Sequence, residues 1–168
     1  LNEMQPYRYG GGMIDIVTEE KTTFAKLPAR LEAGTPNYSG IITWGAALDY
    51  LMDIGIGRMA SYEEELIKKA EEVLETIPQV NILGHPKQRA GCISIQIEGV
   101  HPYDFASMID KYGVAVRTGS MCAQPIVNKM GLDTVIRISP AFYNTMEEME
   151  KLGEYTEKVI AFFERIKR

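Results

Sequence analysis

The chain has 168 residues, of which 45% are hydrophobic and 24% charged, and its formal net charge is −5. That length suits one domain, or one domain with part of another, and can bury a core without a metal or a disulfide. The acidic balance and the lack of a Lys/Arg run argue against nucleic-acid binding, and no apolar stretch predicts a membrane span. With no visible signal peptide, we expect a cytoplasmic globular protein.

The first third of the chain is rich in residues that interrupt regular structure. Glycines at 10–12 and a Gly-Thr-Pro-Asn turn at 34–37 predict irregular backbone, apart from a short strand at 13–17. A helical pattern then runs over 41–54 and ends at Gly55. This glycine, with Gly57 close by, predicts a boundary, so we divide the chain into residues 1–57 and 58–168.

The second part of the chain carries a regular series of amphipathic elements. The predicted elements are a helix at 62–77, a strand at 93–97, a helix at 102–112, a strand at 114–116, a loop with a short turn at 117–130, a strand at 135–138 and a final helix from 145. Thr145 and Glu148 have the spacing of a capping box at the start of that last helix. This order predicts an α+β layer, in which helices cover one side of a small sheet.

Cys122 is the residue whose position most suggests reactivity. It follows a predicted strand and lies near a glycine, while Arg117 close by would favour a thiolate. The residues alone leave open whether this thiol is exposed and reactive or buried and inert, because free cysteine is among the most buried types. Cys92 opens a strand and is interpreted as small apolar filler, and a disulfide between the two remains open. Without CxxC spacing or clustered histidines, no metal site is predicted.

Arg137 lies inside an apolar strand, where its charge must reach solvent or meet an anion. A carboxylate is the sharper alternative, because the guanidinium fork matches it with two parallel hydrogen bonds. Gly34 and Thr35 precede a helix and would either cap it or offer a phosphate site. His85 and His101 each precede a proline and are interpreted as turn or cap residues.

Five stretches of the chain combine into a family pattern. They are Arg8–Met13, Arg30–Asn37, Ala115–Gly119 leading to Cys122–Pro125, Arg137–Ser139 and Tyr143–Thr145. In this order they resemble the C-terminal half of the class V aminotransferase-like cysteine desulfurases. The resemblance is closest to the group that serves iron–sulfur cluster assembly and is related to selenocysteine lyases. It runs over essentially the whole chain, and its specific parts are Glu-Ala-Gly-Thr-Pro-Asn and Arg-x-Gly-x-x-Cys-Ala-x-Pro.

The resemblance implies an α/β fold, that of the pyridoxal-phosphate (PLP)-dependent transferases of the aspartate-aminotransferase type. Residues 1–57 would be the tail of the large PLP-binding domain, and residues 58–168 the small C-terminal α+β domain. The first segment would then expose surface that packs elsewhere in the full-length enzyme or on a second subunit of a homodimer. We therefore expect disorder, domain exchange or self-association in that segment when it stands alone.

The resemblance also implies an activity and assigns roles to residues. The enzyme would convert L-cysteine to L-alanine, with PLP as the electron sink, and pass the sulfur to an acceptor protein. Cys122 would be the catalytic nucleophile that holds the sulfur as a persulfide. Arg137 would bind the substrate carboxylate, and Arg117 would line the entrance beside it. Thr35, with the backbone near Gly34, would bind the cofactor phosphate of the other subunit.

Two departures from the family pattern bear on these roles. Ser120 and Met121 stand where the family often has histidines, and neither relays a proton as histidine does. The lysine that holds the cofactor as a Schiff base is expected upstream of Leu1, because Lys21, Lys26 and Lys111 lack its context. We therefore expect the 168-residue chain by itself to bind no PLP and to show no turnover.

Two other functions remain open at the level of sequence. A selenocysteine lyase, or another class V aminotransferase, would share the motifs. The reaction with L-selenocysteine would then depend less on Cys122. A protein of another class, a stand-alone binding or scaffold module built on the small domain, would need a stable fold for its first 40 residues.

Overall fold

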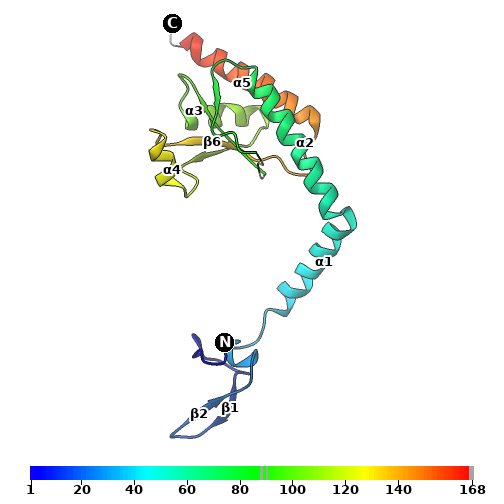
Figure 1. Ribbon diagram of the computed structural model, residues 1–168, viewed down its shortest axis with the longest axis vertical. Helices are drawn as coiled ribbons and strands as arrows, with labels where there is room; N and C mark the ends of the chain where they lie inside the picture. Colours follow the sequence, from blue (N-terminus) through cyan, green and yellow to red (C-terminus); the bar gives the residue numbers. More distant parts are fainter. Residues whose placement is uncertain (88, 90, 167–168) are drawn as a thin grey trace. The chain divides into compact units, whose positions relative to one another are not determined.

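The computed structural model describes residues 1–87, 89 and 91–166 (Figure 1). It separates into two compact units, Leu1–Asp53 and the residues from Ile54 onward. Gly55, whose φ of +94° suits glycine, breaks the chain between helix α1 (Tyr38–Ile54) and helix α2 (Ile56–Glu75). The boundary expected after residue 57 would fall inside the first turn of α2, whereas the structure divides just before the glycine.

The N-terminal unit holds a small hairpin and one long helix. Strand β1 (Ile14–Val17) pairs antiparallel with β2 (Thr22–Phe24), and a 3-10 turn follows at Ala29–Leu31. The predicted strand is confirmed, while β2 and the 3-10 turn lie in the stretch predicted as irregular. Helix α1 begins at Tyr38 rather than at 41, because the Asn37 side chain accepts the Gly40 N–H at 3.0 Å and caps it.

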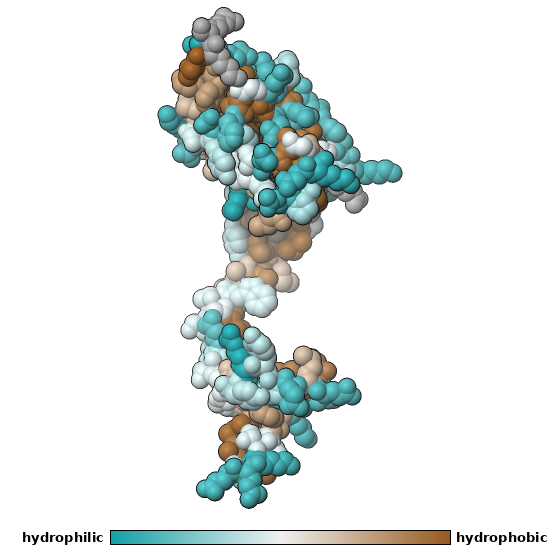
Figure 2. Space-filling view, turned by 90° about the vertical axis from the view of Figure 1, so that its left-hand side faces the viewer, coloured by the Kyte–Doolittle hydropathy of each residue, from teal (hydrophilic) through white to brown (hydrophobic). Residues whose placement is uncertain are grey.

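Most of the hydrophobic side chains of this unit are on its surface. Helix α1 buries none of its residues, and strand β1 is exposed along its length. The exposed large hydrophobic residues of the helix are Tyr38, Ile41, Ile42, Trp44, Leu48, Tyr50 and Met52. Figure 2 shows brown, hydrophobic surface on the lower body, which is this unit. In the part of the chain that the structure describes, no helix is long and apolar enough to cross a membrane.

The C-terminal unit is built on a four-stranded antiparallel sheet in the order β3-β4-β6-β5. Its strands are β3 (Val80–Ile82), β4 (Ile93–Ile97), β5 (Arg117–Gly119) and β6 (Val135–Ile138). Its helices besides α2 are α3 (Pro102–Ile109), continued by a 3-10 turn at Asp110–Tyr112, then α4 (Gln124–Lys129) and α5 (Met146–Ile166). Helices α2 and α5 pack along each other (Figure 1).

The core of this unit lies between the sheet and the helices. Ile93, Ile95 and Ile97 of β4 are buried and alternate with half-buried polar residues, as the sequence predicted. Strands β3 and β6 add Ile82, Ile136 and Ile138 to the apolar cluster, and helices α2, α3 and α5 supply most of its other members, so these helices lie on one face of the sheet. The α2–α5 contact is close, because a Cβ on Gly153 would lie 3.1 Å from Val73 Cβ. The predicted α+β layer is therefore present.

Three local predictions in this unit were wrong. Residues 114–116 are not a strand, and the strand lies at 117–119 instead, because those residues pair with β6. The stretch 117–130 holds β5 and α4 in addition to a turn. Strand β3 was not predicted, since its three residues are too short to show an alternating pattern and form a strand by pairing with β4.

The capping box at the start of α5 is confirmed. The Glu148 N–H donates to Thr145 Oγ1 at 3.2 Å, and the Thr145 N–H donates to Glu148 Oε2 at 2.9 Å. The latter bond, helped by the Asn144 side-chain amide, lowers the pKa of Glu148 below its ordinary value. The segment between β6 and α5 is also tied to α2, where Tyr62 donates to the Asn144 carbonyl at 3.1 Å.

Candidate active site

Two arginines lie directly opposite each other on the face of the sheet that the helices leave open. Arg117 of β5 is the cross-strand partner of Arg137 of β6, and Arg137 is in turn opposite Ser94 of β4. Side chains of directly opposed residues project from the same face. Like charges in this position repel each other, so the pair is suited to an anion that lies over both.

Arg137 differs from Arg117 in its surroundings. Its side chain is half-buried, and its Nε is buried without a hydrogen-bond partner among the described residues. Arg117 is exposed. A buried guanidinium nitrogen without an acceptor is costly, which favours the carboxylate-binding alternative for Arg137 over a simple position on the solvated face.

Cys122 stands at the tip of a tight turn that follows β5. Met121 and Cys122 have φ of +54° and +59°, and the Ala123 N–H donates to the Ser120 carbonyl at 2.8 Å. Two successive left-handed residues define a type I′ turn, which normally carries glycine or asparagine. Each left-handed non-glycine residue costs about 1–2 kcal/mol, so the sequence accepts strain at the cysteine.

The structure answers one part of the question that the sequence left open about Cys122, namely its exposure. The cysteine is free and exposed, so it is not a buried filler residue. Helix α4 begins two residues later, and its buried Val127 anchors the segment to the rest of the unit. The thiol is therefore presented to solvent from a short, anchored turn on the strand that carries Arg117.

Cys92 has no part in this arrangement. It lies half-buried just before Ile93 of β4, which pairs with Ile138 at the C-terminal end of β6. Cys122 follows Gly119 of β5, which pairs with Val135 at the N-terminal end of β6. The two cysteines thus lie at opposite ends of β6 and on strands that flank it. Neighbouring strands are about 4.8 Å apart, so the cysteines are too far apart for a direct disulfide.

Thr35 and Gly34 belong to the N-terminal unit. Gly34 has a φ of +85°, and its N–H donates to the Gly11 carbonyl at 2.9 Å, so this donor is already used. Thr35 is exposed, and its hydroxyl makes no hydrogen bond within the described residues. In the same unit, the Arg30 guanidinium donates to the carbonyls of Asn2 and Met4 at 3.0 Å each. Of the two predicted residues, Thr35 therefore has the free donor.

The remaining polar residues singled out in the sequence have structural roles or none. His101 caps α3, because its Nδ1 accepts the Tyr103 N–H, as expected for a cap residue. His85 is exposed. The described residues contain no group of His, Cys, Asp or Glu side chains able to hold a metal ion.

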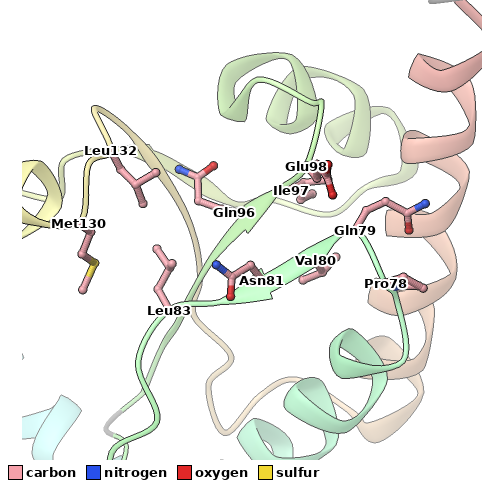
Figure 3. A pocket seen from close by; sticks show the side chains of 10 residues that line it. All are labelled: Pro78, Gln79, Val80, Asn81, Leu83, Gln96, Ile97, Glu98, Met130 and Leu132. Atoms are coloured by element: carbon pink, nitrogen blue, oxygen red, sulfur yellow. The ribbon is translucent and has the colours of Figure 1, made fainter.

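A hollow of about 660 Å³ lies elsewhere on the C-terminal unit, around β3. Figure 3 shows its lining, with Asn81 and Gln96 from β3 and β4 and with Met130 and Leu132 from the segment before β6. It includes neither the arginines nor Cys122, so it is not the candidate site.

The comparison with known proteins agrees with the geometry. A family model described as Aminotransferase class-V matches residues 1–152. The chain belongs to this family. A cysteine desulfurase of Salmonella agona strain SL483 is 44% identical over 153 residues, which make up 90% of this chain and 37% of that protein.

Solved structures of the same family confirm the predicted fold class. The apo cysteine desulfurase of Thermococcus onnurineus NA1 has a TM-score of 0.86 at 34% identity, over 93% of this chain and 39% of that one. The cysteine desulfurase CsdA (S-sulfonic acid) from Escherichia coli has a TM-score of 0.85 at 31% identity, over 95% of this chain and 39% of that one. The chain therefore spans about two-fifths of the length of the relatives it matches.

Proposed function

We propose that this chain is the C-terminal part of a PLP-dependent cysteine desulfurase that supplies sulfur for iron–sulfur cluster assembly. The observation that carries the proposal is the joining of three features on two paired strands. An exposed cysteine stands on a strained turn after β5, Arg117 precedes it, and Arg137 lies opposite with an unpaired Nε. A nucleophilic thiol and a carboxylate fork are two of the groups that the proposed desulfuration of an amino acid uses, alongside the cofactor.

In this proposal Cys122 carries the sulfur. Its Sγ attacks the sulfur of the substrate, so that an S–S bond forms while the substrate's C–S bond breaks. The electron pair of the broken bond stays on carbon, which takes up a proton and becomes the methyl group of alanine. Cys122 is left as a persulfide, and its exposure leaves that sulfur open to an acceptor protein.

Arg137 and Arg117 would hold the substrate during this step. The half-buried guanidinium of Arg137 would bind the α-carboxylate with two parallel hydrogen bonds. Arg117, which is exposed and opposite it, would add positive charge at the entrance and draw the anionic substrate in. Together they would fix the substrate relative to the turn that bears Cys122.

The cofactor residues present in this chain fit a phosphate contact. The free hydroxyl of exposed Thr35 is a suitable donor to a phosphate, while Gly34 supplies the left-handed turn before it. PLP, when bound, would withdraw electrons from the substrate's Cα and so weaken the bond to sulfur. Lys21, Lys26 and Lys111 are exposed, so the lysine that holds the cofactor is expected in another part of the full-length enzyme.

The exposed apolar surface of the N-terminal unit supports a further part of the proposal. Helix α1, with Trp44 65% exposed, needs a covering partner to be stable in water. We propose that this partner is the rest of the large domain together with a second copy in a homodimer. Thr35 would then serve the phosphate of the other subunit.

The experiment is carried out on the full-length protein loaded with PLP. Release of alanine from L-cysteine is measured for the natural protein, for Cys122→Ala and for the matched control Cys92→Ala, with a reductant present. We expect the control to keep its activity and Cys122→Ala to lose at least about a hundredfold, since the nucleophile is gone. Full activity of Cys122→Ala on L-cysteine would refute the sulfur-carrier role.

The same variants separate the selenocysteine lyase alternative. Selenide leaves more readily than sulfide, so a lyase would release alanine from L-selenocysteine without Cys122. A desulfurase would show its large loss on L-cysteine only. The 168-residue chain by itself, incubated with PLP and then freed of unbound cofactor, is expected to show neither the absorbance of bound cofactor nor turnover.

A further inference from the structure

The register of the sheet places Ser94 closest to the carboxylate-binding arginine. The Leu83 N–H donates to the Ser94 carbonyl at 2.8 Å, so the polar backbone groups of Ser94 point toward β3. Ser94 and Arg137 are therefore opposite each other without sharing backbone hydrogen bonds. In such a pair the Cα atoms are about 4.5 Å apart and the side chains are at their closest.

The unpaired nitrogen of Arg137 defines what is missing at this point. Nε is buried, so a ligand that arrives from solvent meets the two terminal nitrogens of the guanidinium and leaves Nε without an acceptor. A buried N–H without an acceptor is unfavourable, and more so in a charged group. The fork needs an acceptor inside the protein to hold it in one orientation.

Ser94 is the side chain placed to provide that acceptor. It is half-buried and makes no side-chain hydrogen bond within the described residues. Gln96, two residues along the same strand, already donates to the Thr134 carbonyl, and Arg117 on the other side carries no acceptor.

We propose that Ser94 is a positioning residue for Arg137. Its hydroxyl accepts the Nε–H, so that both terminal nitrogens of the guanidinium face the substrate carboxylate end-on. The inference deepens the proposed function, on which the nature of the substrate rests. Ser94 thereby tunes the affinity for the carboxylate and has no part in breaking the C–S bond.

The test uses the full-length enzyme with Ser94→Ala, Ser94→Thr and the control Ser107→Ala, whose serine is exposed on α3. Calorimetry measures binding of two probes. Propionate carries a carboxylate and no thiol, while cysteamine is cysteine without its carboxylate. Steady-state kinetics with L-cysteine give KM and kcat, and circular dichroism checks that each variant is folded.

Ser94→Ala is expected to weaken propionate binding and raise KM for L-cysteine, each roughly tenfold, the factor for one hydrogen bond to a charged group. Cysteamine affinity and kcat should change less than about twofold, and Ser94→Thr should restore propionate binding because it keeps the hydroxyl. Equal propionate affinity in Ser94→Ala and the natural protein, or failure of Ser94→Thr to restore it, would overturn the proposal. If the natural protein released no alanine, the proposed function would fail, while the propionate and cysteamine comparison would still judge Ser94.

Discussion

The two units of the chain differ in where their hydrophobic side chains lie. The C-terminal unit buries most of its isoleucines and leucines, together with Phe105, between a sheet and three helices. The N-terminal unit buries Met13 but leaves α1 and β1 exposed along their length. A segment that buries so little apolar surface cannot offset the entropy of ordering its backbone. We infer from this difference that the first unit needs a partner to cover its apolar surface, whereas the second buries enough apolar surface to fold by itself.

The sharpest test of this difference removes one large side chain from each unit. Phe105→Ala should lower the free energy of unfolding of the 168-residue chain by about 3–5 kcal/mol, because Phe105 is fully buried. Trp44→Ala should change it by less than about 0.5 kcal/mol, because that side chain is exposed. Urea denaturation followed by circular dichroism measures both. Equal losses would show that α1 is packed as firmly as the core.

A pair of helical glycines sharpens the comparison at a smaller scale. Gly153→Val should cost about 2 kcal/mol, because an added Cβ would lie 3.1 Å from Val73 Cβ and further carbons would force α2 and α5 apart. Gly45→Val in α1 should stay within about 0.5 kcal/mol, since an added Cβ would meet no atom within 4 Å beyond its chain neighbours and its own helix backbone. The same denaturation experiment decides, and a neutral Gly153→Val would show a looser helix contact than described.

The start of α5 offers a test of local rather than core stability. Thr145→Ala removes the hydroxyl that accepts the Glu148 N–H, and should cost about 1 kcal/mol. Thr145→Asn keeps a capping oxygen and should recover most of that loss. Melting temperatures of the two variants provide the measurement. If both variants matched the natural chain, the cap would contribute nothing to stability.

The smallest expected effect is a dependence on pH. The pKa of Glu148 in the folded chain lies below the ordinary value of 4.5, because its carboxylate accepts the Thr145 N–H. Its contribution is therefore complete above about pH 4.5 and is lost as the pH falls through the folded value. The side chain is exposed, so the change is small. Glu148→Gln should flatten the profile of stability below about pH 4.5, where the carboxylate of the natural chain loses its charge.

The sequence predicted those elements whose pattern is local. The alternation Ile93-Ser94-Ile95 predicted β4, and the spacing of Thr145 and Glu148 predicted the cap, because both signals lie within a few residues. Strand β3 and the true position of β5 were missed, since each becomes a strand by pairing with a distant segment. Valines at 114 and 116 favoured a strand that tertiary pairing then placed further along.

The candidate site was predictable in its residues and not in its geometry. The motif around Cys122 and the arginine inside an apolar strand were visible as types of residue in a pattern. The left-handed backbone at Met121 and Cys122 was not, because neither is a residue that favours such a turn. The alternation had put Ser94 on the polar face, yet its place beside Arg137 follows only from the pairing of β4 with β6.

On the proposed function, the opposed pair of Arg117 and Arg137 would make the stability of the sheet edge depend on the concentration of the carboxylate ligand. Strand β5 has three residues at the edge of the sheet, and two positive charges across it weaken its attachment to β6. A bound carboxylate removes that repulsion, and by mass action a ligand at a hundredfold its Kd adds about 2.7 kcal/mol to stability. On the proposed function, loss of that ligand would leave this edge of the sheet easier to open and more accessible to proteases, whereas abundant ligand would protect it.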